Sequence, residues 1–267
     1  MKRVWGHLLA GVSLVTACVV SISACKHDDS TLFVQDVLAA QPVAAGAQCT
    51  FTSDPTQPFI SSGVLDIAFR QEYDPTYLIA NQAVAEVNSQ QLATETDIIT
   101  VQGAVVRITD ASGNQLNTFT RLASATVYPS SGSVPGYAPI TVTTLDSATI
   151  ANDADLQLNV NNQGTTRLIT YVKFFGLTTG GNNIESGEFE FPVDVCKGCL
   201  VVFGADDESS AYPLPNCKNA GNSSSSTSLP SPCVQGQDFS VDCSLCQSLS
   251  VCQGAAAGVT LPDAGAD

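Results

Sequence analysis

Cysteine is the residue type whose number and spacing could do chemistry in this chain. Eight cysteines follow residue 48: Cys49, Cys196, Cys199, Cys217, Cys233, Cys243, Cys246 and Cys252. An even set in an exported chain is typical of disulfide bonds. We therefore predict four disulfides, one of them joining Cys49 to a C-terminal cysteine. The spacing leaves the pairing open.

Two of these cysteine pairs have a spacing that also suits other chemistry. Cys196-Lys197-Gly198-Cys199 and Cys243-Ser244-Leu245-Cys246 have the spacing of the two knuckles of a four-thiolate zinc site. Either pair could instead form a thioredoxin-like redox centre. Such centres rely on a helix N-terminus to stabilise the thiolate, however, and Cys196 follows a predicted strand. Both alternatives rank behind the disulfides, and we predict no metal or cofactor.

The first 24 residues have the pattern of an export signal. Lys2 and Arg3 precede an apolar stretch that ends in Ile22-Ser23-Ala24-Cys25, and charged residues follow at once. The four residues Ile22 to Cys25 resemble the lipobox of bacterial lipoproteins. That resemblance implies diacylation of Cys25 and cleavage before it. Residues 15–18 also fit the pattern, but cleavage at Cys18 would leave an apolar start to the mature chain.

Composition excludes several function classes. Without the signal, 243 residues remain, with 25 Asp/Glu against 8 Lys/Arg (10 minus Lys2 and Arg3), a formal net charge of −17. This field disfavours nucleic acid and anionic lipid surfaces, so membrane attachment must come from the lipid on Cys25. The only remaining histidine is His27, beside the anchor. It is poorly placed for a catalytic triad, a His-ligated zinc site or a His general base.

Short apolar runs separated by turn residues predict strands from Cys49 onward. Apolar residues alternate with other residues in two of these runs, 65–70 and 188–195. The predicted core face contains Leu65, Ile67, Phe69, Phe189, Phe191 and Val193, together with Val106 and Ile108. Gly103 marks a bulge, and residues 110–114 predict a hairpin turn. Thr76–Val84 is also predicted as a strand. Pro192 lacks an amide donor, which favours an edge position for its strand.

These patterns predict an all-β chain: an antiparallel β-sandwich with a disulfide-rich, loop-dominated C-terminal extension. The expected boundaries are a signal peptide at 1–24, a lipidated Cys25 and tether at 25–48, the sandwich at 49–203, the cysteine-rich module at 204–253 and a disordered tail at 254–267. The tether could include a short helix near Leu32–Ala40. The stretch Thr165–Val195 resembles the late strands of an immunoglobulin-like domain, which implies a scaffold.

The overall plan resembles that of envelope lipoproteins of Gram-negative bacteria. It implies an outer-membrane lipoprotein, with Lys26 after the acylated cysteine resembling the outer-membrane sorting pattern. We expect a non-enzymatic binding or structural role with an envelope protein or glycan partner, no nucleic acid and no catalytic residues. The alternatives are a hydrolase with paired carboxylates and a zinc-binding module. Asn152–Asp155 and Asp206–Glu208 offer oxygen ligands for calcium, but we expect solvated loops there.

Overall fold

The computed structural model describes residues 30–40, 49–85, 95–203, 217 and 232–253. Predictions for the signal peptide 1–24, Cys25, Asp206–Glu208 and the tail 254–267 fall outside the described residues. The described part is mostly β, as predicted.

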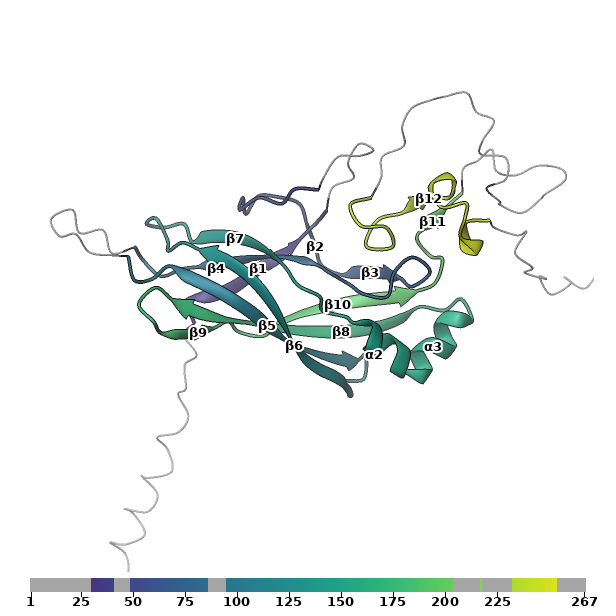
Figure 1. The fold of residues 1–267 in the computed structure, drawn as a ribbon, viewed down its shortest axis with the longest axis horizontal. Helices are drawn as coiled ribbons and strands as arrows, with labels where there is room; N and C mark the ends of the chain where they lie inside the picture. Colours follow the sequence, from purple (N-terminus) through teal and green to yellow (C-terminus); the bar gives the residue numbers. More distant parts are fainter. Residues whose placement is uncertain (1–29, 41–48, 86–94, 204–216, 218–231, 254–267) are drawn as a thin grey trace, which may run out of the picture. The chain divides into compact units, whose positions relative to one another are not determined.

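Ten strands form two sheets (Figure 1). The smaller sheet is antiparallel throughout and has the order β2 (Phe59–Ile60), β1 (Leu32–Leu38), β4 (Thr76–Asn81), β7 (Gly136–Thr141). The larger sheet has the order β3 (Gly63–Asp66), β10 (Phe189–Cys196), β8 (Thr166–Thr178), β5 (Ile99–Asp110), β6 (Gln115–Val127), and β9 (Asn183–Glu185) also pairs with β8. In this sheet β3 runs parallel to β10, which departs from the predicted all-antiparallel arrangement.

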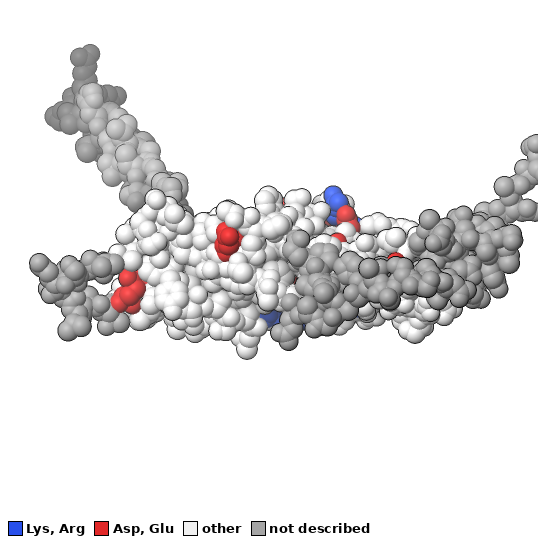
Figure 2. All heavy atoms as spheres, turned by 90° about the horizontal axis from the view of Figure 1, so that it is seen from above, with Lys and Arg blue, Asp and Glu red and all other residues white. Residues whose placement is uncertain are grey.

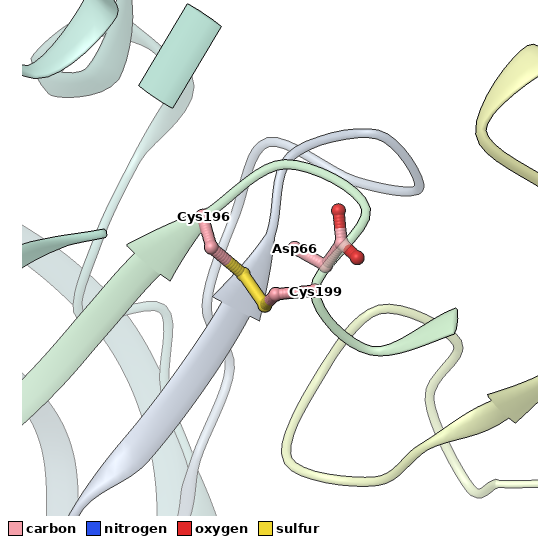
Figure 3. A group of neighbouring side chains, drawn as sticks. All are labelled: Asp66, Cys196 and Cys199. Atoms are coloured by element: carbon pink, nitrogen blue, oxygen red, sulfur yellow. A yellow bond between two sulfur atoms is a disulfide. The ribbon is translucent and has the colours of Figure 1, made fainter. Parts of the chain in front are cut away.

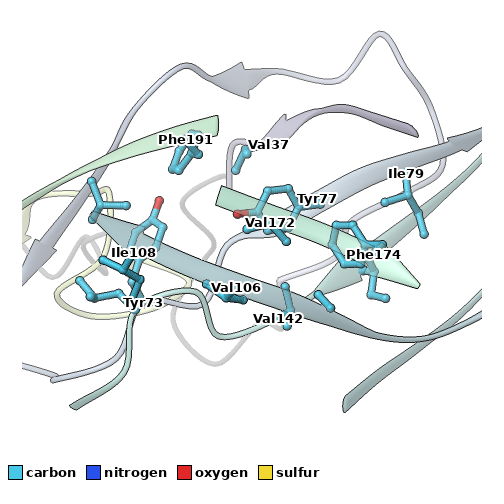
Figure 4. Packing of buried hydrophobic residues seen from close by; sticks show 14 of the residues in the cluster. Val37, Tyr73, Tyr77, Ile79, Val106, Ile108, Val142, Val172, Phe174 and Phe191 are labelled. Atoms are coloured by element: carbon cyan, nitrogen blue, oxygen red, sulfur yellow. The ribbon is translucent and has the colours of Figure 1, made fainter. Parts of the chain in front are cut away.

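The two sheets share one hydrophobic core (Figure 4). Tyr77 on β4 packs edge-on against Phe174 on β8 and Phe189 on β10, with ring centroids 5.5 Å and 5.9 Å apart. Leu65, Val106, Ile108, Phe191 and Val193 of the predicted core are buried, whereas Ile67, Phe69 and Phe189 are partly buried. The predicted core face is therefore largely confirmed, although an immunoglobulin-like topology does not follow from it.

The structure confirms the bulge and the hairpin turn that were predicted from local sequence. The pairing of β5 with both neighbours shifts between Val101 and Gly103, which is the predicted bulge. Asp110 accepts hydrogen bonds from the turn amides of Ser112 and Asn114, and Gly113 has φ of +87°. A positive φ at this place needs glycine, and it closes the predicted hairpin between β5 and β6.

The predictions for two segments were wrong. Leu32–Leu38 is neither tether nor helix but strand β1, which pairs with β4 over six residue pairs and buries Leu32 and Val37 in the core. The strand beginning at Phe189 is not at a sheet edge, since β10 lies between β3 and β8. Pro192 is tolerated there because β3 pairs with β10 only from Val193 onward.

Two helices that the strand patterns did not predict follow β7. They are α2 (Ser147–Asn152) and α3 (Ala154–Asn161), and each begins with an aspartate cap. Asp146 accepts the Thr149 amide at 2.9 Å and Asp153 accepts the Leu156 amide at 3.0 Å. The stretch Asn152–Asp155, weighed for calcium, is therefore the junction of two helices, with Asp153 engaged as a cap.

Beyond β10 the chain forms a small module. Strand β11 (Val201–Val202) runs parallel to β12 (Val241–Asp242), and two 3-10 helices follow, η2 (Cys243–Leu245) and η3 (Ser250–Cys252).

Candidate functional site

All eight cysteines after residue 48 are paired. The bonds are Cys49–Cys233, Cys196–Cys199, Cys217–Cys243 and Cys246–Cys252. Cys49 is joined to the C-terminal segment, the partnership that its isolation in the sequence predicted. Cys243 and Cys246 bond to other partners, so the two CxxC pairs do not share one four-thiolate zinc site. That interpretation is wrong for this structure.

The disulfides form the interior of the C-terminal module. Cys217, Cys243, Cys246 and Cys252 are buried with Val241 in a second cluster, against which Phe69, Val201, Phe203, Leu249 and Val251 pack. Crosslinks here replace the large apolar side chains that the segment lacks.

Buried polar side chains attach this module to the sandwich. Tyr73 Oη donates to both carboxylate oxygens of Asp238, at 2.9 Å and 3.0 Å, and the Val64 amide donates to the same carboxylate at 2.9 Å. Next to it, the Gln237 side chain accepts from the Asp74 amide and donates to the Asp74 carbonyl. Asp238 has φ of +63°, so the chain turns sharply to present it. These hydrogen bonds join Gln237 and Asp238 of the C-terminal module to Val64, Tyr73 and Asp74 of the sandwich.

Burial perturbs both acids of that contact. Desolvation raises the pKa of Asp238 above its ordinary value of 3.8, although the hydrogen bonds from Val64 and Tyr73 act in the opposite direction. Burial also raises the pKa of Tyr73 well above 10, with the charge of Asp238 adding to the effect. The phenol therefore stays protonated and remains a donor.

A fully buried carboxylate organises the CxxC turn at the end of β10. Parallel pairing sets Cys196 opposite Asp66 of β3. Asp66 is fully buried, and its carboxylate accepts the backbone amides of Gly198 (2.7 Å), Ala68 (3.0 Å) and Leu200 (3.0 Å). Figure 3 shows Asp66 beside the bonded sulfurs of Cys196 and Cys199, and one carboxylate oxygen and the two sulfurs lie within 4.8 Å of one another.

The CxxC turn borders a pocket. The pocket has a volume of about 410 Å³ and is lined by residues 163–165 after α3, by the turn 196–199, by Phe203 and by residues 250–251 of η3. Among these described lining residues, Lys197 supplies the one full charge, and its Nζ bonds to Asn161 Oδ1 at 3.0 Å. The described lining therefore combines the Cys196–Cys199 disulfide with one lysine and uncharged side chains, and it contains no carboxylate.

Charge is dispersed on the face of the molecule seen in Figure 2. Figure 2 shows acidic side chains scattered over one face without forming a patch. Several acids lie beside a base from another strand, for example Asp194 with Arg167 and Glu185 with Lys173. Within the described residues, no helix is long and apolar enough to cross a membrane.

Sequence reasoning identified the cysteines but missed Asp66, Tyr73 and Asp238. Asp66 was placed on the exposed face of an alternating strand, yet β3 ends at that residue and the chain turns over it. Asp238 lies in a segment without a periodic pattern. Asp66 has one local partner, the Ala68 amide, but its other two donors and the partners of Asp238 lie more than 100 residues away in sequence.

Comparison with known proteins adds little. No family model matches the chain, and no curated protein matches it. Among solved structures, a protein from Archaeoglobus fulgidus is similar at 12% identity, covering 49% of this chain and 92% of that chain with a TM-score of 0.27. That score carries no argument about fold or function.

Proposed function

We propose that this chain is an outer-membrane lipoprotein anchored through a lipid on Cys25, with a non-enzymatic binding or structural role in the cell envelope. The scaffold would be an immunoglobulin-like sandwich that presents a disulfide-stapled cap. The observation that carries the proposal is the pairing of all eight cysteines after residue 48 into four disulfides. Such bonds form and persist in exported proteins.

The use of four buried or partly buried carboxylates favours binding over hydrolysis. Asp66 and Asp153 accept backbone amides, Asp146 caps α2 and meets Arg121 at 3.1 Å, and Asp238 accepts from Tyr73. Each of these groups is engaged in holding the fold. A carboxylate-pair glycosidase instead needs two carboxyl groups facing across a cleft, roughly 5–9.5 Å apart.

The partner we propose is an envelope protein or a glycan. The negative balance of the chain disfavours nucleic acid. Attachment by lipid would restrict the sandwich to the membrane surface, where even a modest affinity gains from high effective concentration.

Acylation mapping tests the anchor. The full-length protein is expressed in a Gram-negative host with labelled palmitate, and the membranes are separated by density. We expect label on Cys25 in the outer-membrane fraction, loss of label and processing in Cys25→Ser, and wild-type behaviour in the control Cys18→Ser. Label retained in Cys25→Ser, or acylation at Cys18, would overturn the assignment.

Crosslinking tests the binding role. Whole cells carrying the anchored protein are treated with a cleavable crosslinker, and captured material is compared with that of a control lipoprotein of equal abundance. Repeated recovery of one envelope protein or peptidoglycan fragment supports the proposal. Hydrolysis of envelope glycans by the purified protein, lost on changing a single carboxylate, would replace it with the hydrolase.

A further inference from the structure

The four disulfides differ in their exposure. Cys196, Cys217, Cys243, Cys246 and Cys252 are buried, and Cys49 and Cys233 are half-buried. Cys199 is the exposed member of the eight, and it lines the 410 Å³ pocket. An external thiol can therefore approach the Cys196–Cys199 bond from solvent, from the Cys199 side.

The turn that carries this bond is held without it. The amides of Gly198 and Leu200 donate to buried Asp66, and β10 pairs with β3 up to Cys196 itself. Lys197 is tied to Asn161. The bond spans a sequence separation of 3, against 184 for Cys49–Cys233, so it restricts the unfolded chain least of the four.

Each of the other three disulfides stabilises packed parts of the structure. Cys217–Cys243 and Cys246–Cys252 form the buried centre of the C-terminal module, and Cys49–Cys233 joins that module to the residues before β2. Opening any of them would expose or release packed chain. Opening Cys196–Cys199 would leave the packing of Asp66 and the strand pairing in place.

We propose that Cys196–Cys199 is a thiol-exchange site, reduced by an external dithiol while the other three disulfides stay intact. A thiolate of the dithiol attacks Cys199 Sγ, the bond between the sulfurs breaks, and Cys196 leaves as a thiolate that takes up a proton from water. The second thiol of the partner then attacks the mixed disulfide and releases Cys199. Two electrons pass to the protein, and the partner becomes the disulfide.

The surroundings suit a switch better than a turnover catalyst. Cys196 Sγ lies 3.6 Å from the Leu65 carbonyl, which can accept from the thiol once the bond is open. The nearby Asp66 carboxylate disfavours a second negative charge, and the turn follows strand β10 rather than beginning a helix of its own. A metal site in the reduced state is less well supported, because the Asp66 oxygens already accept three amides.

Differential alkylation tests the proposal on the full-length protein in detergent. The native protein is exposed to dithiothreitol at neutral pH, samples are acid-quenched, and new thiols are labelled and mapped. We expect Cys196 and Cys199 to be labelled at least about tenfold faster than Cys246 and Cys252, the matched control pair of short separation, because the control sulfurs are buried. Near-ultraviolet circular dichroism should change little during that first phase.

The proposal would be overturned if the near-ultraviolet circular dichroism were lost at the same rate as Cys196 and Cys199 are labelled. It would also be overturned if Cys246 and Cys252 were labelled at the same time as Cys196 and Cys199. Single variants then test the direction of attack. In Cys196→Ser the free Cys199 thiol should react with an aromatic disulfide reagent at least about tenfold faster than the free Cys196 thiol in Cys199→Ser, since access limits exchange. Equal or reversed rates would show that the exposure of Cys199 does not direct the reaction.

Discussion

Replacing Tyr73 with Phe removes one oxygen from the contact that attaches the C-terminal module to the sandwich. The ring of Tyr73 is buried and stacks on Phe191 with centroids 6.2 Å apart, and phenylalanine preserves that packing. Asp238 loses the donor that reaches both of its oxygens and keeps the Val64 amide. A hydrogen bond to a charged group contributes about 1.5–3 kcal/mol, so we expect Tyr73→Phe to lower the free energy of unfolding by about 2 kcal/mol at neutral pH.

The loss should depend on pH in a defined direction. Burial raises the pKa of Asp238, so as pH rises above 3.8 the unfolded chain releases this proton first, and the Asp238 contribution to stability falls until pH passes the folded pKa. The Tyr73 hydrogen bond lowers that pKa and so offsets part of the fall. The cost of Tyr73→Phe should therefore be full above the folded pKa of Asp238 and smaller below pH 3.8, where the carboxyl is neutral.

Urea unfolding of wild type and variant at pH 7 and near pH 3.5, under non-reducing conditions, measures both effects. Tyr128→Phe is the matched control, because Tyr128 is 64% exposed and should change stability by no more than about 0.5 kcal/mol. The reasoning fails if Tyr73→Phe matches that control at pH 7. It also fails if Tyr73→Phe lowers the free energy of unfolding equally at both pH values, since the ionised carboxylate of Asp238 would then not be the group that Tyr73 stabilises.

Three further predictions use the same unfolding assay. Phe191→Ala should cost about 3–5 kcal/mol, because the ring is 1% exposed; a loss below about 1 kcal/mol would contradict its core position. Replacing Cys49 and Cys233 together by Ser should lower the free energy of unfolding by up to about 5 kcal/mol, since their bond closes the longest of the four loops. A smaller loss than that from removing Cys246–Cys252, whose sequence separation is 6, would refute the chain-entropy account. Burial raises the pKa of Tyr77 above 10, so the free energy of unfolding should fall as pH rises past 10. In Tyr77→Phe that fall should be shallower by up to about 1.4 kcal/mol per pH unit. An unchanged slope in the variant would argue against the burial of Tyr77.

The features that the sequence predicted well have local causes. Gly103 interrupts an alternating pattern, and a bulge is the local way to keep the apolar face inward. Asp110 and Gly113 form a turn from neighbouring residues alone. The buried face of β10, with Phe191 and Val193, follows from a period of two. In each case the information lies within about ten residues of the feature.

The errors arose where tertiary pairing decided the structure. Leu32–Leu38 has little alternation, and it becomes a strand because β4 offers a partner on one side and β2 on the other. The helices α2 and α3 begin at Asp146 and Asp153, whose caps are short-range signals that strand patterning obscured. Pro192 fits an inner strand because its neighbour β3 starts one residue later, a register that no local pattern specifies.

Asp66 illustrates why the candidate site was the hardest part to predict. Propensity rules place an aspartate after an apolar strand residue at the surface, and burying a carboxylate is unfavourable unless donors compensate. Two of its three donors, the amides of Gly198 and Leu200, come from more than 130 residues away, and they arrive only when β10 pairs in parallel with β3 in one register. A shift of one residue would turn the side chains of β3 to the opposite face. The cysteines could be found by counting, whereas the carboxylate that holds their turn becomes visible only once the sheet is assembled.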